Sequence, residues 1–184
     1  MRHNKIRDLE AELMREVCYN VQTEPPLIPV EADNAYGIED DRKRPDVAGV
    51  GVWGPYEKTF LDIMITHPNC PSYVNKPIDQ IYANQERIKK RKYNERIVHV
   101  EKGTFTPIVG STFGGWGVEA NRHHKRVATL MAEKKNEEYA DVMNYIRTRL
   151  CFTMLKSVLI AIRGVRGQSK KAAAISTLSF NLID

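Results

Sequence analysis

The chain has 184 residues, and its 28 lysines and arginines exceed its 23 aspartates and glutamates by a formal net charge of +5. This length is enough for one domain with its own hydrophobic core. The small basic excess does not by itself identify a nucleic-acid ligand, but it is concentrated at residues 87–96 and 163–171. The sequence has no apolar run of about 18 residues or more, so we expect no membrane-spanning helix. Its charged start does not resemble a signal peptide.

The three cysteines, Cys18, Cys70 and Cys151, are odd in number and widely spaced. They form neither a metal-binding Cys-x-x-Cys pair nor the framework of a disulfide-rich secreted protein. We therefore expect a reducing, intracellular location.

The first part of the chain predicts a helix and an extended segment. Residues 3–19 have apolar side chains every three or four positions, which is typical of an amphipathic helix. Residues 23–29 contain three prolines, which exclude helix and favour a sheet edge. Residues 31–43 are polar and acidic, which indicates a surface loop.

Two strands are expected next, at residues 45–53 and 58–66, with Gly54-Pro55 as the turn between them. A charged helix at 76–97 separates them from another strand at 104–109.

Two further helices are predicted at 118–135 and 138–163, so the order is helix, strand, strand, strand, helix, strand, helix, helix. This order predicts an α/β protein in which a mixed sheet is flanked by helices. We expect a single domain over 1–165, with a helical extension from about 118 and a weakly structured tail at 166–184.

Two aspartates carry the strongest chemical signal. Asp46 follows Pro45 at the start of one predicted strand, and Asp62 lies among apolar neighbours in the next. A carboxylate in a buried strand is unfavourable unless it is paired or bound to a metal. Acidic oxygens on adjacent strands can share a divalent cation. The plainer interpretation is a turn residue and a solvent-facing strand residue.

A basic cluster follows on the predicted helix at 76–97. Lys89 and Lys92 are three residues apart and share a helix face, whereas Lys90 and Arg91 face elsewhere. Such a cluster is usually a solvated surface, but an ammonium group beside the aspartates could orient a water molecule or stabilise charge on a phosphate.

The remaining polar motifs are less specific. Residues 111–117 form a glycine-containing turn before a helix, which could contact a phosphate through backbone N–H groups or serve as a plain turn. The adjacent His123 and His124 match no zinc motif, and we expect them on different sides of a helix at the surface. Possible third carboxylates near a metal are Glu12, Glu16 and Glu24.

The order and spacing of these motifs resemble the PD-(D/E)XK restriction-endonuclease-like fold. The similarity is to the variant found in the endonuclease domains of site-specific non-LTR retrotransposons, in which the lysine lies on the following helix. It covers residues 2–120, and the matching motifs are Arg2-His3-Asn4, Arg44-Pro45-Asp46, Leu61-Asp62-Ile63, and Lys89 with Lys92-Tyr93. The chain departs from the usual signature at Met64, where that signature has lysine.

The resemblance implies a metal-dependent DNA endonuclease domain of a retroelement. Asp46 and Asp62 would hold Mg²⁺ or Mn²⁺, and Lys92 or Lys89 would position the attacking water or neutralise the phosphate. The resemblance also implies a neighbouring reverse transcriptase in the same polyprotein, and a nuclear location in a eukaryote. Residues assigned to DNA contact are Lys90, Arg91, Arg87 and His3.

Two other functions fit the same sequence. One is a nucleic-acid-binding module that has the nuclease-like fold without catalysis. The other is an interaction domain whose last helix packs on a partner through the apolar stripe from Val142 to Val158. The sequence indicates neither an oligomeric state nor a target site.

Overall fold

The computed structural model describes the backbone of residues 2–30 and 44–178, and the surroundings of side chains for residues 3–30 and 44–163. The predicted loop at 31–43 and residues 179–184 lie outside the described residues. Within residues 2–30 and 44–178, no helix is long and apolar enough to cross a membrane.

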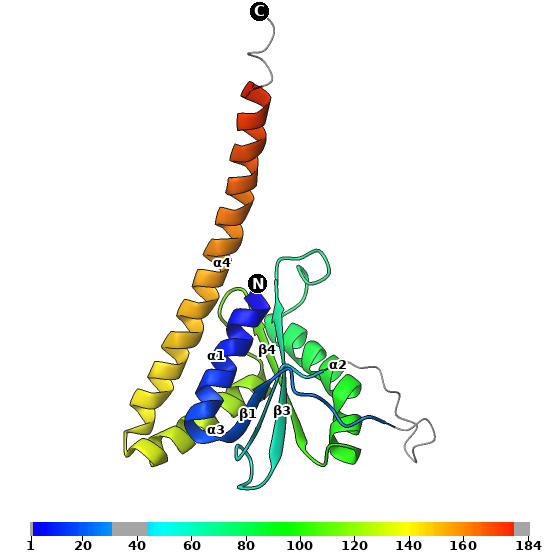
Figure 1. Ribbon diagram of the computed structural model, residues 1–184, viewed down its shortest axis with the longest axis vertical. Coiled ribbons are helices and arrows are strands. Elements are labelled where there is room, and N and C mark those ends of the chain that lie inside the picture. Colours follow the sequence, from blue (N-terminus) through cyan, green and yellow to red (C-terminus); the bar gives the residue numbers. More distant parts are fainter. Residues whose placement is uncertain (1, 31–43, 179–184) are drawn as a thin grey trace, which may run out of the picture.

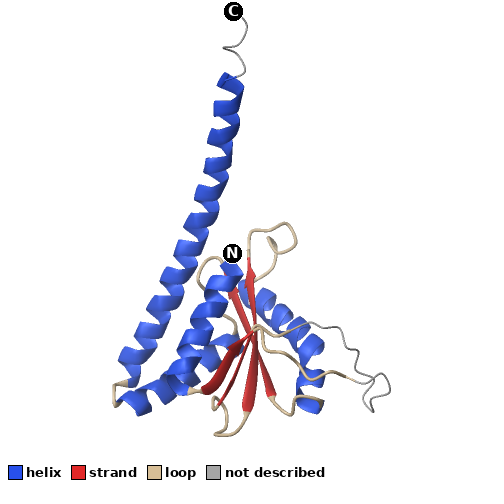
Figure 2. Ribbon diagram, in the orientation of Figure 1, coloured by secondary structure: helices blue, strands red, loops and turns tan. Residues whose placement is uncertain are grey.

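The structure is an α/β fold in which helices flank one sheet, as the element order predicts (Figure 1, Figure 2). The eight elements are α1 (Arg2–Val17), β1 (Tyr19–Thr23), β2 (Val47–Val50), β3 (Lys58–Thr66), α2 (Ile78–His99), β4 (Thr104–Ser111), α3 (Val118–Lys135) and α4 (Tyr139–Leu178).

The sheet is mixed and has the strand order β1-β2-β3-β4. β1, β2 and β3 are antiparallel neighbours, whereas β3 and β4 are parallel. The parallel pair requires a crossover connection, which α2 provides. β3 is therefore a central strand with pairing partners on both edges.

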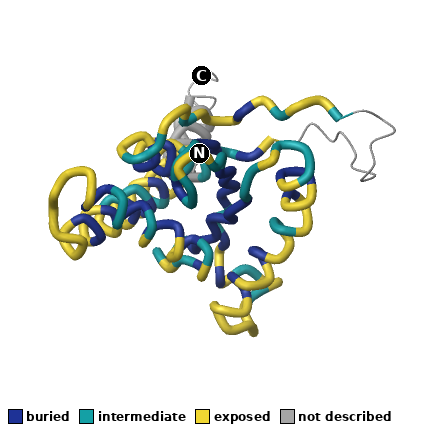
Figure 3. The backbone as a smooth tube through the Cα atoms, turned by 90° about the horizontal axis from the view of Figure 1, so that it is seen from below, coloured by how far each residue is buried: buried dark blue, intermediate teal, exposed yellow. Residues whose placement is uncertain are grey.

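Both faces of β3 are covered. On one face, Leu61 and Ile63 pack with Ile6 and Met14 of α1. On the other face, Phe60 packs with Tyr93 and other residues of α2. α4 lies outside α1 and α3 and packs on both. Figure 3 shows the buried segments gathered along the sheet and the inner sides of the helices.

Three elements differ from the sequence-based expectation. β2 covers only Val47–Val50 of the strand expected at 45–53. The first strand covers Tyr19–Thr23 rather than 23–29, because the prolines at 25, 26 and 29 lack the N–H groups that a ladder requires. The last helix does not end at 163 but continues to Leu178. Gly164 and Gly167 cost only about 1 kcal/mol each in a helix, and the residues after them include good helix formers.

The adjacent His123 and His124 are buried, so the expectation that they lie at the surface is wrong. Both rings point their Nε2 atoms at the buried carboxylate of Glu10 in α1. His124 Nε2 is 2.7 Å from Glu10 Oε1, and His123 Nε2 is 3.7 Å from Glu10 Oε2. The rings can reach one carboxylate because residues one apart on a helix differ by only about 100° in direction.

This cluster makes the fold sensitive to acid. Burial lowers the pKa of His123 from 6.5 to about 4. Burial alone would raise the pKa of Glu10, but the charge and hydrogen bond of His124 outweigh it, and the pKa of Glu10 lies below its usual value. In both cases the unfolded chain binds protons more readily than the folded one, so stability falls as pH falls.

We expect the free energy of unfolding to decrease by up to about 2–3 kcal/mol between pH near 7.5 and pH near 4.5 through His123 alone. Urea denaturation at the two pH values measures it. His123→Leu should reduce this loss because the variant has no imidazole to protonate. His67→Gln, which removes an exposed histidine, is the matched control and should leave the loss unchanged. An equal loss in wild type and His123→Leu would contradict the assignment.

Candidate active site at Asp46 and Asp62

Asp46 is held against the two residues that flank Asp62. It directly precedes β2, whose first residue Val47 pairs with Leu61 of β3. The Asp46 N–H donates to the Leu61 carbonyl at 2.9 Å, and Asp46 Oδ2 accepts from the Ile63 N–H at 2.6 Å. The two predicted aspartates are therefore neighbours at one end of the β2–β3 ladder.

Asp62 lies on the face of the sheet that α2 covers, and it is only 4% exposed. Lys89 Nζ is 2.5 Å from Asp62 Oδ2, an ion pair whose angles are not those of a hydrogen bond. Burial raises the pKa of Asp62, and the charge of Asp46 raises it further, while Lys89 and a hydrogen bond from Tyr93 act in the opposite direction. The net shift in the pKa of Asp62 is upward, so this environment disfavours the ionised carboxylate relative to water.

His3, in the first turn of α1, contacts Asp46 from the other side. Its Nε2 is 3.0 Å from Asp46 Oδ2. The hydrogen bond to Asp46 raises the pKa of His3 above 6.5. Asp46 Oδ2 thus accepts from both a backbone N–H and an imidazole, which fixes the orientation of its carboxylate.

An open pocket of about 470 Å³ adjoins these side chains. It includes Met64, which occupies the position where the usual signature has lysine, and Lys89, whose ammonium group arrives from α2 instead. The residues that line it are His3, Ile63, Met64, Ile65, His67, Lys89 and Thr112. The pocket therefore has an imidazole on one wall and an ammonium group on another.

The structure distinguishes the two candidate lysines. Lys89 contacts Asp62 directly. Lys92 Nζ donates to the Tyr93 hydroxyl at 2.7 Å and lies 4.3 Å from the centre of that ring. Lys92 is therefore connected to Asp62 through Tyr93, which sequence reasoning had noted only as part of a motif.

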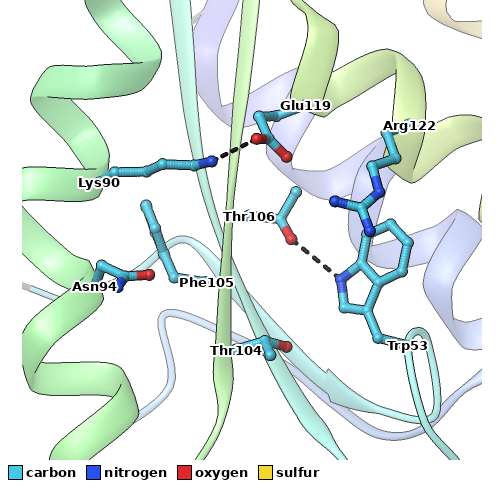
Figure 4. Close-up of a pocket in the computed structure, with 8 residues that line it drawn as sticks. All are labelled: Trp53, Lys90, Asn94, Thr104, Phe105, Thr106, Glu119 and Arg122. Atoms are coloured by element: carbon cyan, nitrogen blue, oxygen red, sulfur yellow. Dashed lines mark hydrogen bonds and ion pairs between the residues drawn. The ribbon is translucent and has the colours of Figure 1, made fainter.

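The other basic residues of α2 do not line this pocket. Lys90 forms an ion pair with Glu119 of α3 and lines a second pocket of about 700 Å³ (Figure 4). In that pocket, Arg122 stacks over Trp53. Arg87 and Arg91 are exposed on α2. The exposed guanidinium groups of Arg87 and Arg91 could contact a polyanion, whereas the charge of Lys90 is already paired with Glu119.

The possible third carboxylates bind cations of the chain itself. The backbone N–H of Glu24 donates to the Asp46 carbonyl at 2.8 Å, so the two residues are neighbours. The side chain of Glu24, however, forms an ion pair with Arg7. Glu12 makes two hydrogen bonds with Arg149 of α4, and Glu16 pairs with Lys135. Across residues 2–30 and 44–178, no group of three or more His, Cys, Asp or Glu side chains is arranged to hold a metal.

The glycine-containing turn at 111–117 is a structural connection from β4 to α3. Glu86 of α2 fills the N-terminal end of α3, where its Oε1 accepts from the Glu119 N–H at 3.0 Å. A side chain on Gly117 would collide with that carboxylate, because a Cβ there would lie 2.3 Å from Glu86 Oε1. Since a carboxylate already occupies this helix end, phosphate binding is disfavoured there.

Asp46 and Asp62 fit a divalent cation in their chemistry and in their burial. Both are hard oxygen donors on neighbouring segments, and Asp62 Oδ2 is buried with the Lys89 ammonium group as its partner at 2.5 Å. Asp46 and Asp62 are the residues that would hold such a cation, with Lys89 beside them.

Lys89→Met should lower the free energy of unfolding by about 1–3 kcal/mol at neutral pH, because it leaves the buried Asp62 carboxylate without its cation. The effect should shrink as the pH falls, because the raised pKa of Asp62 lets the carboxylate bind a proton more readily. Urea denaturation in the presence of a chelator measures both. Lys90→Met, which breaks the more exposed pair with Glu119, should cost less and show no such trend. Equal, pH-independent losses would argue against a buried Lys89–Asp62 pair.

Comparison with known proteins does not add a family to this geometry. No protein-family model matches the chain, and no curated protein matches it with significant sequence similarity. The arrangement of His3, Asp46, Asp62 and Lys89 is therefore the basis on which a function is argued.

Proposed function

We propose that the chain is a metal-dependent endonuclease domain that hydrolyses DNA phosphodiester bonds. The observation that carries the proposal is that one open pocket is lined by Lys89, which contacts Asp62, and by His3, which contacts Asp46. Four segments of the chain supply these side chains, and Asp62 is only 4% exposed. Buried ionisable groups beside an open pocket are candidates for functional sites.

In this proposal the two aspartates hold Mg²⁺ or Mn²⁺. The bound cation would lower the pKa of a water molecule and stabilise charge on the phosphate. Asp62 is suited to the role because it is a buried carboxylate, and a cation beside it would favour its ionised form. Asp46 is suited because His3 and the Ile63 N–H fix its carboxylate.

Lys89 and His3 would act on the phosphate side of the pocket. Lys89 reaches Asp62 from α2 while also lining the pocket, so its ammonium group can orient a water molecule or neutralise a phosphate oxygen. His3 lines the same pocket with a raised pKa. A protonated imidazole there would attract the negatively charged substrate.

DNA contact would come from exposed basic residues of α2. Arg87 and Arg91 are the exposed guanidinium groups of α2, the helix that also presents Lys89. Such residues position the phosphate backbone without reading sequence. The motif resemblance leads us to place this domain in a retroelement, next to a reverse transcriptase of the same polyprotein, where it would nick the target site.

Nicking of supercoiled plasmid tests the proposal. We expect the protein to convert supercoiled DNA to the open-circular form with Mg²⁺ or Mn²⁺, and we expect the activity to vanish with chelator. Asp46→Ala and Asp62→Ala should each reduce the rate by at least about 100-fold, since each removes a metal ligand. Glu12→Ala is the matched control, because it removes an acid that pairs with Arg149 away from the pocket.

Absence of cleavage by folded protein, combined with salt-sensitive DNA binding, would replace the nuclease by an inactive binding module of the same fold. If the folded protein neither cleaves nor binds DNA, both functions are excluded and an interaction domain is favoured.

The same assay should distinguish the roles of Lys89 and Lys92, because substitution of each should reduce the cleavage rate by a different factor. Lys89→Ala should reduce cleavage by about 10²–10³-fold, the range seen when one stabilising group is removed from a transition state. Lys92→Ala should have a smaller effect, because its ammonium group contacts Tyr93 rather than Asp62. Single-turnover rates at saturating DNA measure chemistry rather than binding. A larger loss in Lys92→Ala than in Lys89→Ala would reverse the assignment.

A further inference from the structure

The helix α4 carries apolar side chains on two opposite sides. One side faces the body of the protein, where Ile146, Leu150 and Met154 are buried. This is the stripe expected from the sequence, and it packs in the core against α1 and α3. It is therefore not available to a partner.

The second side is exposed. Phe152, Leu155, Leu159 and Ile162 are 56%, 51%, 45% and 50% exposed. At about 100° per residue, they lie roughly 120–200° around the helix from the buried Leu150. Figure 1 shows α4 extending well beyond the rest of the domain, so the body does not cover this side. Exposed apolar patches of this kind usually mark a contact surface.

The spacing of the exposed residues identifies the shape of the missing neighbour. They follow one another at intervals of three, four and three residues, which places them in a short apolar seam along one side of the helix. Such a seam packs against another helix. We call these four residues the α4 seam.

Basic residues lie beside the α4 seam. Lys156 and Arg163 each follow a seam residue and flank it on the same side, and the other flank has the uncharged Cys151 and Val158. Lys156 also lines a pocket between α1 and α4 that contains Asp8 and Glu12. Arg149 stands one heptad before Lys156 on this flank and binds Glu12 of α1 at 2.9 and 2.8 Å. The flank already accepts an acidic residue from a neighbouring helix within the chain.

We propose that the α4 seam docks an amphipathic helix of another protein or domain, with acidic residues facing Lys156 and Arg163. A second copy of this chain fits less well. Antiparallel pairing would bring the two basic flanks together, and parallel pairing would place them against the uncharged flank, so neither forms ion pairs. The inference does not depend on the proposed nuclease activity.

Two synthetic helical peptides test the proposal. Both have a leucine seam over about three heptads, and they differ only in having glutamate or lysine at every flanking position. We expect the full chain to bind the glutamate peptide at least about tenfold more tightly than the lysine peptide in fluorescence anisotropy. Lys156→Glu with Arg163→Glu should reverse this preference. Lys125→Glu with Arg147→Glu, which makes the same change in net charge at other exposed positions, should leave it intact.

Leu155→Ser with Leu159→Ser should weaken binding of the glutamate peptide by at least about tenfold without unfolding the protein, because both leucines are exposed. Asp62→Ala should bind it as the wild type does. Equal binding of the two peptides, or a preference that survives the charge reversal, would overturn the proposal. If sedimentation instead shows that the wild type is a dimer and that the leucine variant is a monomer, that result would overturn the proposal, because the seam would then bind a second copy of this chain.

Discussion

Burial of β3 on both faces is the constraint on which the candidate site depends. A strand that is covered on both sides has to be apolar or to provide a partner for each polar group. Most of β3 satisfies this with Phe, Leu and Ile, and the exception in its middle is Asp62. The helix that covers this face supplies Lys89 to it. The packing of α2 on the sheet therefore also places Lys89 beside Asp62 in the candidate site.

The same constraint explains why Asp46 belongs to the site. The ladder between β2 and β3 brings the segment before Val47 against Leu61 and Ile63, whose backbone groups hold Asp46. α1 packs on the opposite face of the sheet, and its first turn reaches the end of the ladder, where His3 meets Asp46. The two faces of the sheet thus contribute a lysine and a histidine to one pair of carboxylates.

The fold and the aspartate pair could be predicted from the sequence because each has a local signal. β3 and α3 are continuous apolar or periodic segments, and their bounds agree with the prediction. Other features depend on contacts that no local pattern contains. Lys89 and Lys92 share a helix face, so the sequence does not distinguish them. In the structure Lys89 contacts Asp62, whereas Lys92 contacts the Tyr93 hydroxyl. The burial of His123 and His124 depends on Glu10, which is more than a hundred positions away.

Asp62 is the residue at which the packing of the sheet and the candidate site coincide. A buried ion pair seldom adds stability, because the loss of hydration offsets the attraction between the charges. Burial raises the pKa of Asp62, and the contacts of Lys89 and Tyr93 act in the opposite direction. An apolar residue would fill the same place in β3 without the loss of hydration. The proposed nuclease would give the carboxylate a role, because it would hold a cation there with Asp46.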